Sequence, residues 1–440
     1  TAAKTVVVRP TKIGYGARVF KAALTIVGLA VAIPSAHAAD ITYRYDHFLF
    51  NIPASAQADW TREAEAWTYN GRIVTPPQIL LADGDEPPSV PHGFARSMVR
   101  DYAPDAIRST LHLYIADRFD REAGSVIIDT TASGAVTFDG IGLPGRHVDL
   151  DALVPLTIEA LRRGIRDIDM PVKETQPTIR VDSAELRDMG IKEVVTVGES
   201  VYAGSPVNRR HNIATGLARF NGHIIPQGEV FSFGKVLGPV NDTTGYRKEL
   251  VIKGDKTEPD FGGGLCQVSS TAYRGAWEHG FPIVQRINHS YAVSYYGPQG
   301  TDATVYPPNP DMKFLNDGPS ALLMQTHHDE NDHAYFIYYG TNDARKSSVY
   351  GPLIWNRSDP PPDRTIETTE LPPGERRKVG DRHPGMNAAW VRTITLPDGT
   401  KKEETTISIY EARPLFYEIG VAAPSAPQPL PDSPPSWIGQ

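Results

Sequence analysis

The sequence predicts an α+β protein of several small domains that ends in a module built around a β-hairpin. Residues 125–140 form a strand-like run, and the apolar residues from Leu150 to Ile165 recur at helical spacing. Residues 388–396 and 400–412 alternate in the period of strands around the turn Pro397-Asp398-Gly399. A chain of 440 residues is also long enough to bury more than one core.

The first 38 residues have the features of a signal peptide. They hold five basic residues and no acidic one, an apolar run at 22–33, and then the small residues of Ala36-His37-Ala38. We expect cleavage after Ala38; the alternative is an uncleaved N-terminal anchor. Because no later run reaches the roughly 20 apolar residues that a bilayer span needs, the mature protein is expected to have no transmembrane segment. Its expected location is the periplasm or the cell wall.

Charge and cysteine content narrow the function classes. The chain has 44 basic and 52 acidic residues, a net charge of −8, and loss of the five basic leader residues leaves 39 against 52, or −13. This acidic balance argues against a nucleic-acid partner, which a basic surface would attract. Cys266 is the only cysteine, so it is a free thiol or pairs with another chain.

Composition divides the rest of the chain into five segments. Residues 39–104 predict an irregular or partial domain, and residues 105–198 a small α+β domain. Residues 199–340 form the central domain, and residues 341–420 the small β module. Residues 421–440 contain six prolines and are expected to be a disordered tail.

Local patterns in the central domain predict its elements. Residues 207–222 favour a helix that ends at Asn221-Gly222, and residues 224–238 favour strands around a Pro-x-Gly turn. Residues 265–280 can form a second helix that stops at Gly280. Residues 286–296 alternate like a strand and precede a turn at 297–300.

The central domain contains words of unusual composition, and in order and spacing they resemble the VanW-like family. These words are NRRHNIA at 208–214, IPQGEVFSF at 225–233, GGGLCQVSS at 262–270, NHSY at 288–291 and TDATV at 301–305. The resemblance implies work in the cell envelope on peptidoglycan or a wall-bound ligand, but no defined reaction. The preceding segment resembles the peptidoglycan-binding domain that commonly accompanies this family, and the C-terminal module is weakly similar to a G5-type module.

Three residues form a candidate catalytic set. Cys266 would lie in the first turn of the helix at 265–280, where the helix dipole and free N–H groups favour a thiolate. If the segments around His289 and Asp302 form a hairpin, His289 can act as general base and Asp302 can orient it. Asn288 is the alternative orienting residue. Gly262, Gly263 and Gly264 would allow close approach of a substrate.

The same residues also have a purely structural interpretation. A free cysteine is among the most often buried residue types, and a glycine run can serve close packing of a helix on a strand. His289 and Asn288 can hydrogen-bond a bend in the core. The sequence leaves both interpretations open.

A second group of residues is a candidate binding surface. Arg209 and Arg210 carry guanidinium groups that pair with carboxylates, which peptidoglycan stem peptides contain; a solvated charged face is the alternative. The full set is Asn208, Arg209, Arg210, His211, Gly262, Gly263, Gly264, Gln267 and Asn288. His211, His279 and His289 have no recognisable zinc spacing, so we expect no metal and no other cofactor.

Two functions follow from these observations. The first is an exported envelope protein of the VanW-like type that binds or helps to remodel peptidoglycan. The second is a thiol-dependent amide hydrolase or transpeptidase that acts on wall peptides through Cys266, His289 and Asp302. The sequence does not indicate an oligomeric state.

Overall fold

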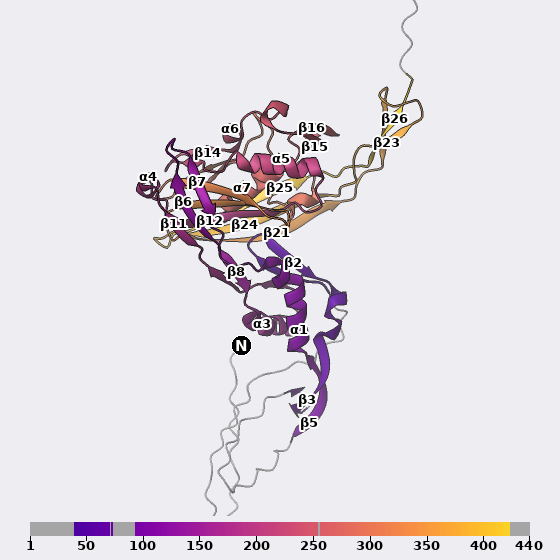
Figure 1. Cartoon of the computed structure of the whole chain (residues 1–440). Coiled ribbons are helices and arrows are strands. Elements are labelled where there is room, and N and C mark those ends of the chain that lie inside the picture. The colour runs from indigo at the N-terminus through magenta and orange to yellow at the C-terminus, as the bar shows by residue number, and fades with distance from the viewer. Residues whose placement is uncertain (1–38, 71, 74–92, 254–255, 423–440) are drawn as a thin grey trace, which may run out of the picture. The chain divides into compact units, whose positions relative to one another are not determined.

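The computed structural model describes residues 39–70, 72–73, 93–253 and 256–422, and these form two compact units. One unit consists of residues 39–123 and 144–175, and the other of residues 124–143 and 176–422. Helices and small sheets occur in both units (Figure 1), which confirms the predicted α+β class. The predicted signal peptide and residues 423–440 of the predicted Pro-rich tail lie outside the described residues. The domain limits expected from the sequence stay predictions.

The first unit combines three small sheets with helices. Its helices are η1 Ala54–Trp60, α1 Pro104–Leu111, η2 His112–Ala116, α2 Asp117–Phe119 and α3 Leu150–Arg162. Its strands are β1 Ile41–Tyr45, β2 Phe48–Ile52, β3 Thr61–Tyr69, β4 Arg72–Ile73, β5 Phe94–Tyr102, β8 Gly145–Val148, β9 Asp167–Asp169 and β10 Val172–Thr175. Tyr43, Leu111 and Leu153 are buried in its core, and the Asp149 side chain caps α3 by accepting from the Ala152 N–H.

The second unit contains the segment with the VanW-like words. Its sheets have the orders β11-β6-β7, β12-β20-β19-β13, β14-β18-β17, β15-β16, β21-β24-β25 and β22-β26-β23. The strands before Pro282 are β6 Ser125–Thr130, β7 Val136–Gly140, β11 Thr178–Val181, β12 Glu193–Val201, β13 Ile224–Ile225, β14 Val230–Ser232, β15 Lys248–Lys253 and β16 Lys256–Phe261. The later ones are β17 Ile283–Gln285, β18 Lys313–Leu315, β19 Leu322–His328, β20 His333–Gly340, β21 Lys346–Ser358, β22 Arg364–Thr368, β23 Arg376–Lys378, β24 Gly385–Thr395, β25 Lys401–Tyr410 and β26 Phe416–Gly420.

Helix α7 (Leu265–His279) is the centre of this unit (Figure 1), and most of its residues are buried. On one side it packs on β12, where a Cβ on Gly198 would lie 2.0 Å from the Thr271 carbonyl oxygen. On another side, Trp277 meets Trp390 of β24 edge-to-face, with ring centroids 5.7 Å apart. The other helices of the unit are α4 Ala184–Asp188, α5 Val207–Ala218, α6 Phe233–Leu237, η3 Asp242–Thr244 and η4 Ser294–Tyr296.

Several elements expected from the sequence agree with the structure and two do not. The helix at 265–280 and the hairpin at 388–412 are confirmed as α7 and β24–β25. The strand expected through Gly238 is wrong after Ser232, because the Ser232 side chain caps α6 and Gly238 ends it with a positive φ of 72°. The strand expected at 286–296 is wrong as well: β17 (Ile283–Gln285) ends before it, and no residue of 286–296 lies in a strand. In this segment the His289 backbone N–H donates to the Asp302 side chain.

Candidate functional site

Cys266 is the second residue of α7, and only Leu265 separates it from the three glycines. Gly262 and Gly264 have positive φ values of 83° and 115°, and a Cβ on Gly263 would lie 2.8 Å from the Leu250 carbonyl oxygen. Only glycine therefore fits this turn, in which the chain passes from β16 into the helix. The backbone N–H of Cys266 has no hydrogen-bond acceptor among the described residues, so a donor remains at the start of the helix.

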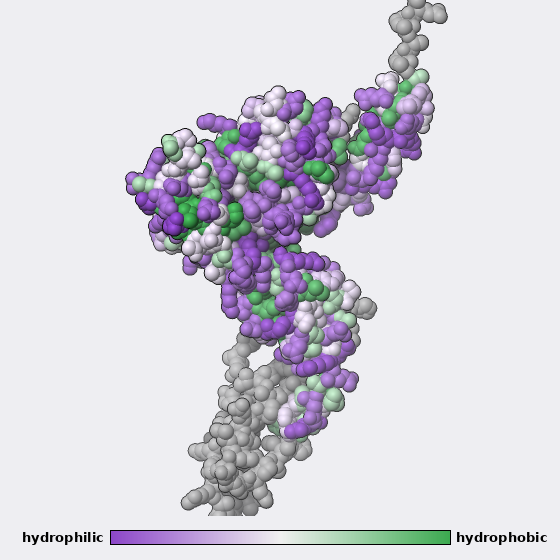
Figure 2. Space-filling model, viewed as in Figure 1, coloured by the Kyte–Doolittle hydropathy of each residue, from purple (hydrophilic) through white to green (hydrophobic). Residues whose placement is uncertain are grey.

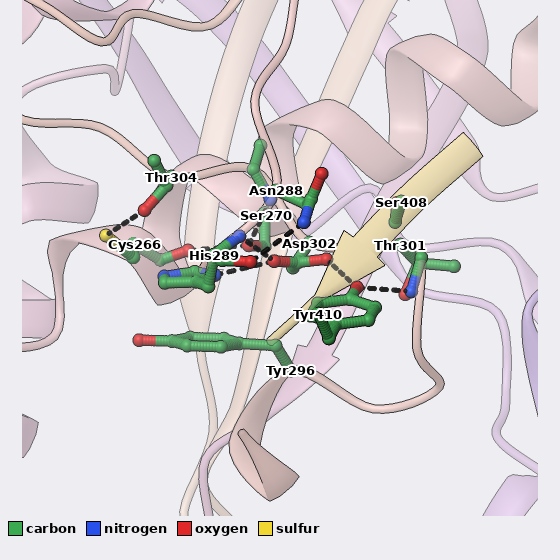
Figure 3. Close-up of polar contacts among 12 residues, drawn as sticks. Cys266, Ser270, Asn288, His289, Tyr296, Thr301, Asp302, Thr304, Ser408 and Tyr410 are labelled. Carbon is green, nitrogen blue, oxygen red and sulfur yellow. Dashed lines mark hydrogen bonds and ion pairs between the residues drawn. The ribbon is translucent and has the colours of Figure 1, made fainter. Parts of the chain in front are cut away.

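Cys266 is half-buried. It packs against the apolar core of the unit, and its Sγ lies 3.6 Å from both the Thr304 hydroxyl and the Val305 carbonyl oxygen. Figure 3 shows His289 lying between Cys266 and Asp302. The thiol thus has an apolar side and a polar side, and the polar side faces the histidine.

His289 and Asp302 form a buried pair. The Nδ1 atom of His289 lies 2.6 Å from Asp302 Oδ2, and the same oxygen accepts the His289 backbone N–H at 2.7 Å. The two residues are 3 % and 2 % exposed. They meet through side chains and not through a strand hairpin, because residues 286–302 are loop and 3-10 turn. The contact that the sequence suggested is therefore made by a different backbone arrangement.

Each of the three residues shifts the pKa of its neighbour toward the charged form. Burial alone would raise the pKa of the Cys266 thiol, but the charge of nearby His289 outweighs burial and lowers it. Burial alone would lower the pKa of His289, but the Cys266 thiolate and the Asp302 carboxylate raise it to about 9. Burial would raise the pKa of Asp302, yet the bond and charge of His289 keep it low. The favoured state is a thiolate beside an imidazolium.

The second ring nitrogen of His289 is the one left for the sulfur. Its Nε2 atom is buried and has no hydrogen-bond partner among the described residues. The ring and the sulfur nevertheless interact strongly enough for each to shift the pKa of the other.

Three further residues surround the pair, and sequence reasoning missed them. Arg286 donates to Asp302 Oδ1 at 3.1 Å, and the Tyr410 hydroxyl donates to the same oxygen at 2.5 Å. The ring of Tyr296 stacks on the His289 ring, with centroids 4.2 Å apart and an angle of 7° between the planes (Figure 3). Arg286 stands two residues before the NHSY word and could have been considered; Tyr410 carries no sequence signal.

A small pocket lies on the Asp302 side of the pair. It has an empty volume of about 170 Å³ and is lined by Ala292, Val293, Tyr296, Gln299, Asp302 and Tyr410. Its polar lining comes from side chains that hold the histidine and its carboxylate. Cys266 does not line it, so this pocket is a space behind the pair and not the approach to the sulfur.

The two arginines of the predicted binding group hold other parts of the protein. Arg209 is buried and donates to the Ser205 hydroxyl and to Gln267 Oε1, at 2.5 and 2.9 Å. Its guanidinium also stacks over the Tyr295 ring, 4.1 Å from the centroid. Arg210 pairs with Asp332 at 2.8 Å and remains partly exposed.

The other polar members of this group also have internal partners. Asn208 donates to the Lys248 carbonyl at 3.2 Å, and His211 Nε2 lies 2.8 Å from the Gly245 carbonyl. Gln267 donates to the Ser200 hydroxyl at 2.9 Å, and Asn288 donates to the carbonyls of His289 and Ile409, both at 2.8 Å. These contacts explain the residues structurally, and ligand binding by them stays a prediction.

The fold and the site together define an α+β domain with a cysteine–histidine–aspartate cluster at the start of its central helix. Residues 208–338 match the family described as VanW like protein. All five words of the sequence and the three residues of the cluster lie in this range. This segment of the chain is therefore VanW-like in sequence.

Two curated proteins are similar to this part of the chain. An uncharacterised protein YoaR of Bacillus subtilis is 33% identical over 166 residues, which cover 37% of this chain and 52% of that protein. The vancomycin B-type resistance protein VanW of Enterococcus faecalis is 29% identical over 115 residues, which cover 25% of this chain and 42% of that protein. The chain thus spans about half the length of these relatives or less.

Proposed function

We propose that the VanW-like domain is a thiol-dependent acyl-transfer enzyme of the cell envelope, an amide hydrolase or transpeptidase that acts on peptides of peptidoglycan. The observation that carries this proposal is the buried Asp302–His289 pair. Asp302 binds one ring nitrogen of His289, and the other, Nε2, has no partner among the described residues and is available to Cys266 at the start of α7. A carboxylate, an imidazole and a thiol in this order are the parts of an activated nucleophile.

The proposed reaction has two half-reactions, and Cys266 and His289 take part in both. The Cys266 thiolate attacks the amide carbonyl carbon, and the backbone N–H at the start of α7 donates to the oxyanion. The His289 imidazolium then gives its proton to the leaving amine as the carbon–nitrogen bond breaks, which leaves a thioester and a neutral imidazole. Neutral His289 next takes a proton from water or from an acceptor amine, which attacks the thioester and releases the thiolate.

The substrate class rests on the family. The resemblance to the VanW-like family and the printed name of the Enterococcus relative support a site of action in the cell envelope. Peptide amides of peptidoglycan are the envelope substrates that acyl transfer would cleave or exchange. An exported location is part of this proposal.

Labelling with an electrophilic thiol probe across pH tests the activation of Cys266. We expect the native protein to label at pH values well below the roughly 8.5 of an ordinary thiol, since the pKa of Cys266 is lowered. His289→Ala should move the midpoint back toward that value, and Cys266→Ala gives the blank. A native midpoint near an ordinary thiol's, unchanged in His289→Ala, would sink the proposal.

A second candidate is envelope binding without turnover. It is favoured by the burial of His289 and by the packing of the Cys266 side chain against the core, which leave little open surface at the sulfur. Release of peptide fragments or free amines from purified sacculi distinguishes the two. Turnover by the native protein that Cys266→Ala abolishes supports the enzyme, whereas retention of both proteins on sacculi without product supports the binding function.

A further inference from the structure

The C-terminal hairpin β24–β25 lies outside the segment that matches the family, yet it contacts the candidate site directly. Tyr410, the last residue of β25, is 4 % exposed, and its hydroxyl donates to Asp302 Oδ1 at 2.5 Å. The same hydroxyl accepts the Gly300 backbone N–H at 2.7 Å. Figure 3 shows Tyr410 on the side of Asp302 that faces away from His289.

Other bonds fasten this hairpin to the loop that holds His289 and Asp302. Arg286 donates to the Ser408 hydroxyl at 2.8 Å, and the Glu411 backbone N–H donates to the Ser290 carbonyl at 2.7 Å. The Trp390 ring N–H donates to the Gln299 carbonyl at 2.8 Å. Both ends of the loop are therefore bound to β24 and β25, and Tyr410 is the residue that reaches the carboxylate.

We propose that Tyr410 is a positioning residue of the cysteine–histidine–aspartate site, and that the β24–β25 hairpin is a wall of this site and not a separate accessory module. The inference rests on the proposed function. Tyr410 does not touch the sulfur; it acts through Asp302, whose orientation fixes His289.

The hydrogen bonds of Asp302 show how this positioning works. Its Oδ2 accepts from the backbone and the ring of His289, and its Oδ1 accepts from Arg286 and Tyr410. Donors on both oxygens fix the plane of the carboxylate, and a fixed carboxylate directs the imidazole toward the sulfur. Without the Tyr410 hydroxyl, Oδ1 keeps only Arg286 and the turn at Gly300 loses an acceptor, so the carboxylate is free to rotate.

Tyr410 is suited to a donor role over a wide pH range. Burial, together with the negative charge of Asp302, raises the pKa of its hydroxyl. Other charged or titratable groups of the described residues near the pair are Cys266, Arg286, Tyr296, Arg209, Tyr273 and Arg274. Of these groups, Arg286 donates to Asp302 Oδ1 alongside the Tyr410 hydroxyl.

The test is the thiolate titration of Cys266 in the full chain, followed by ultraviolet absorbance and by the rate of probe labelling. Because the chain has one cysteine, probe labelling reports this residue alone, and subtraction of the absorbance of the matching Cys266→Ala variant removes the contribution of the tyrosines from the other signal. We expect Tyr410→Phe to raise the midpoint by roughly one pH unit, which lowers the thiolate fraction about tenfold on the acid side. Tyr338→Phe is the matched control, because that buried hydroxyl donates to the Ala272 carbonyl and not to Asp302.

A second comparison separates positioning from a general loss of packing. If Tyr410 acts through Asp302, Tyr410→Phe should cause no further shift in an Asp302→Asn background. Equal midpoints for Tyr410→Phe and Tyr338→Phe, in a protein whose midpoint does respond to His289→Ala, would overturn this inference and leave the proposed function intact. A native midpoint that does not respond to His289→Ala overturns both.

Discussion

At the scale of single residues, the charge state of Cys266 depends on His289, and that of His289 depends on Asp302. The imidazolium is present below the His289 pKa of about 9 and is lost as the pH rises through that value. The thiolate is lost when the pH falls through the lowered pKa of Cys266. The proposed ion pair therefore exists in the pH window between these two values, and loss of either partner ends it.

Asp302→Asn should lower the upper pH limit of the ion pair between Cys266 and His289. The variant removes the negative charge and weakens the hydrogen bond that raise the pKa of His289, so this pKa should fall by roughly 1–3 units. Titration of the His289 ring signal by NMR, assigned with His289→Ala, measures the change. Asp311→Asn is the control, because Asp311 is also buried but binds Ser232 and Gly234. An unchanged His289 pKa in Asp302→Asn would contradict the assigned role.

At the scale of elements, the position of α7 decides where the cysteine lies. The helix approaches β12 so closely because Gly198 and Gly275 face each other: a Cβ on Gly275 would lie 2.6 Å from the Gly198 nitrogen. Bonds from Thr196 to the Gly275 carbonyl and between Ser200 and Thr271, at 3.0 and 2.6 Å, run along the same contact. The glycine pair thus sets the depth at which the first turn of α7 is buried.

Gly198→Ala should destabilise the second unit and disturb the site. Its Cβ would meet the Thr271 carbonyl at 2.0 Å, so the helix must shift, at a cost of about 1–3 kcal/mol in the free energy of unfolding. Urea denaturation measures this cost, and probe labelling of Cys266 should slow in parallel. Gly380→Ala serves as control, since its nearest neighbours, in Phe416, lie at 3.5 Å or more. Equal stability of the two variants would argue against the close packing.

At the scale of the whole molecule, surface charge limits how the protein can bind a wall. The chain carries a net charge of −8, and hydrophilic residues prevail on the face drawn in Figure 2. Among the described residues, no helix is both long enough and apolar enough to cross a membrane. Since peptidoglycan stems carry carboxylates, general electrostatic attraction cannot supply the affinity, and specific contacts have to.

Binding to purified sacculi should therefore persist at high salt. Cys266→Ala, which cannot turn the substrate over, is expected to cosediment with sacculi equally at 0.1 and at about 0.5 M salt, where exposed charges are screened. Arg210→Gln, at a partly exposed candidate position, should weaken retention. Arg187→Gln is its control, because the Arg187 guanidinium donates to the backbone carbonyls of Val181 and Asp182. Full recovery of the protein in the unbound fraction would count against wall binding.

Local sequence was sufficient for the elements whose signals are local. The triple glycine, the start of α7 and the hairpin turn at Pro397-Asp398-Gly399 each depend on residues that are close together in the chain. The choice of Cys266, His289 and Asp302 as one group also came from the sequence, and the structure places His289 and Asp302 in direct contact. The expected strand hairpin was wrong, because side-chain bonds to Asp302 replace a strand ladder there.

Other features depend on contacts between residues far apart in the chain. Tyr410 reaches Asp302 across 108 positions and Arg286 reaches Ser408 across 122, and no periodicity or motif encodes such a pairing. The same holds for Arg209, whose charge suggested a ligand site but whose guanidinium is buried on Gln267. The amino-acid order thus specified the chemical groups and their local conformations. Packing of distant strands and helices determined which groups meet, because burial and hydrogen-bond satisfaction are settled only when the core closes.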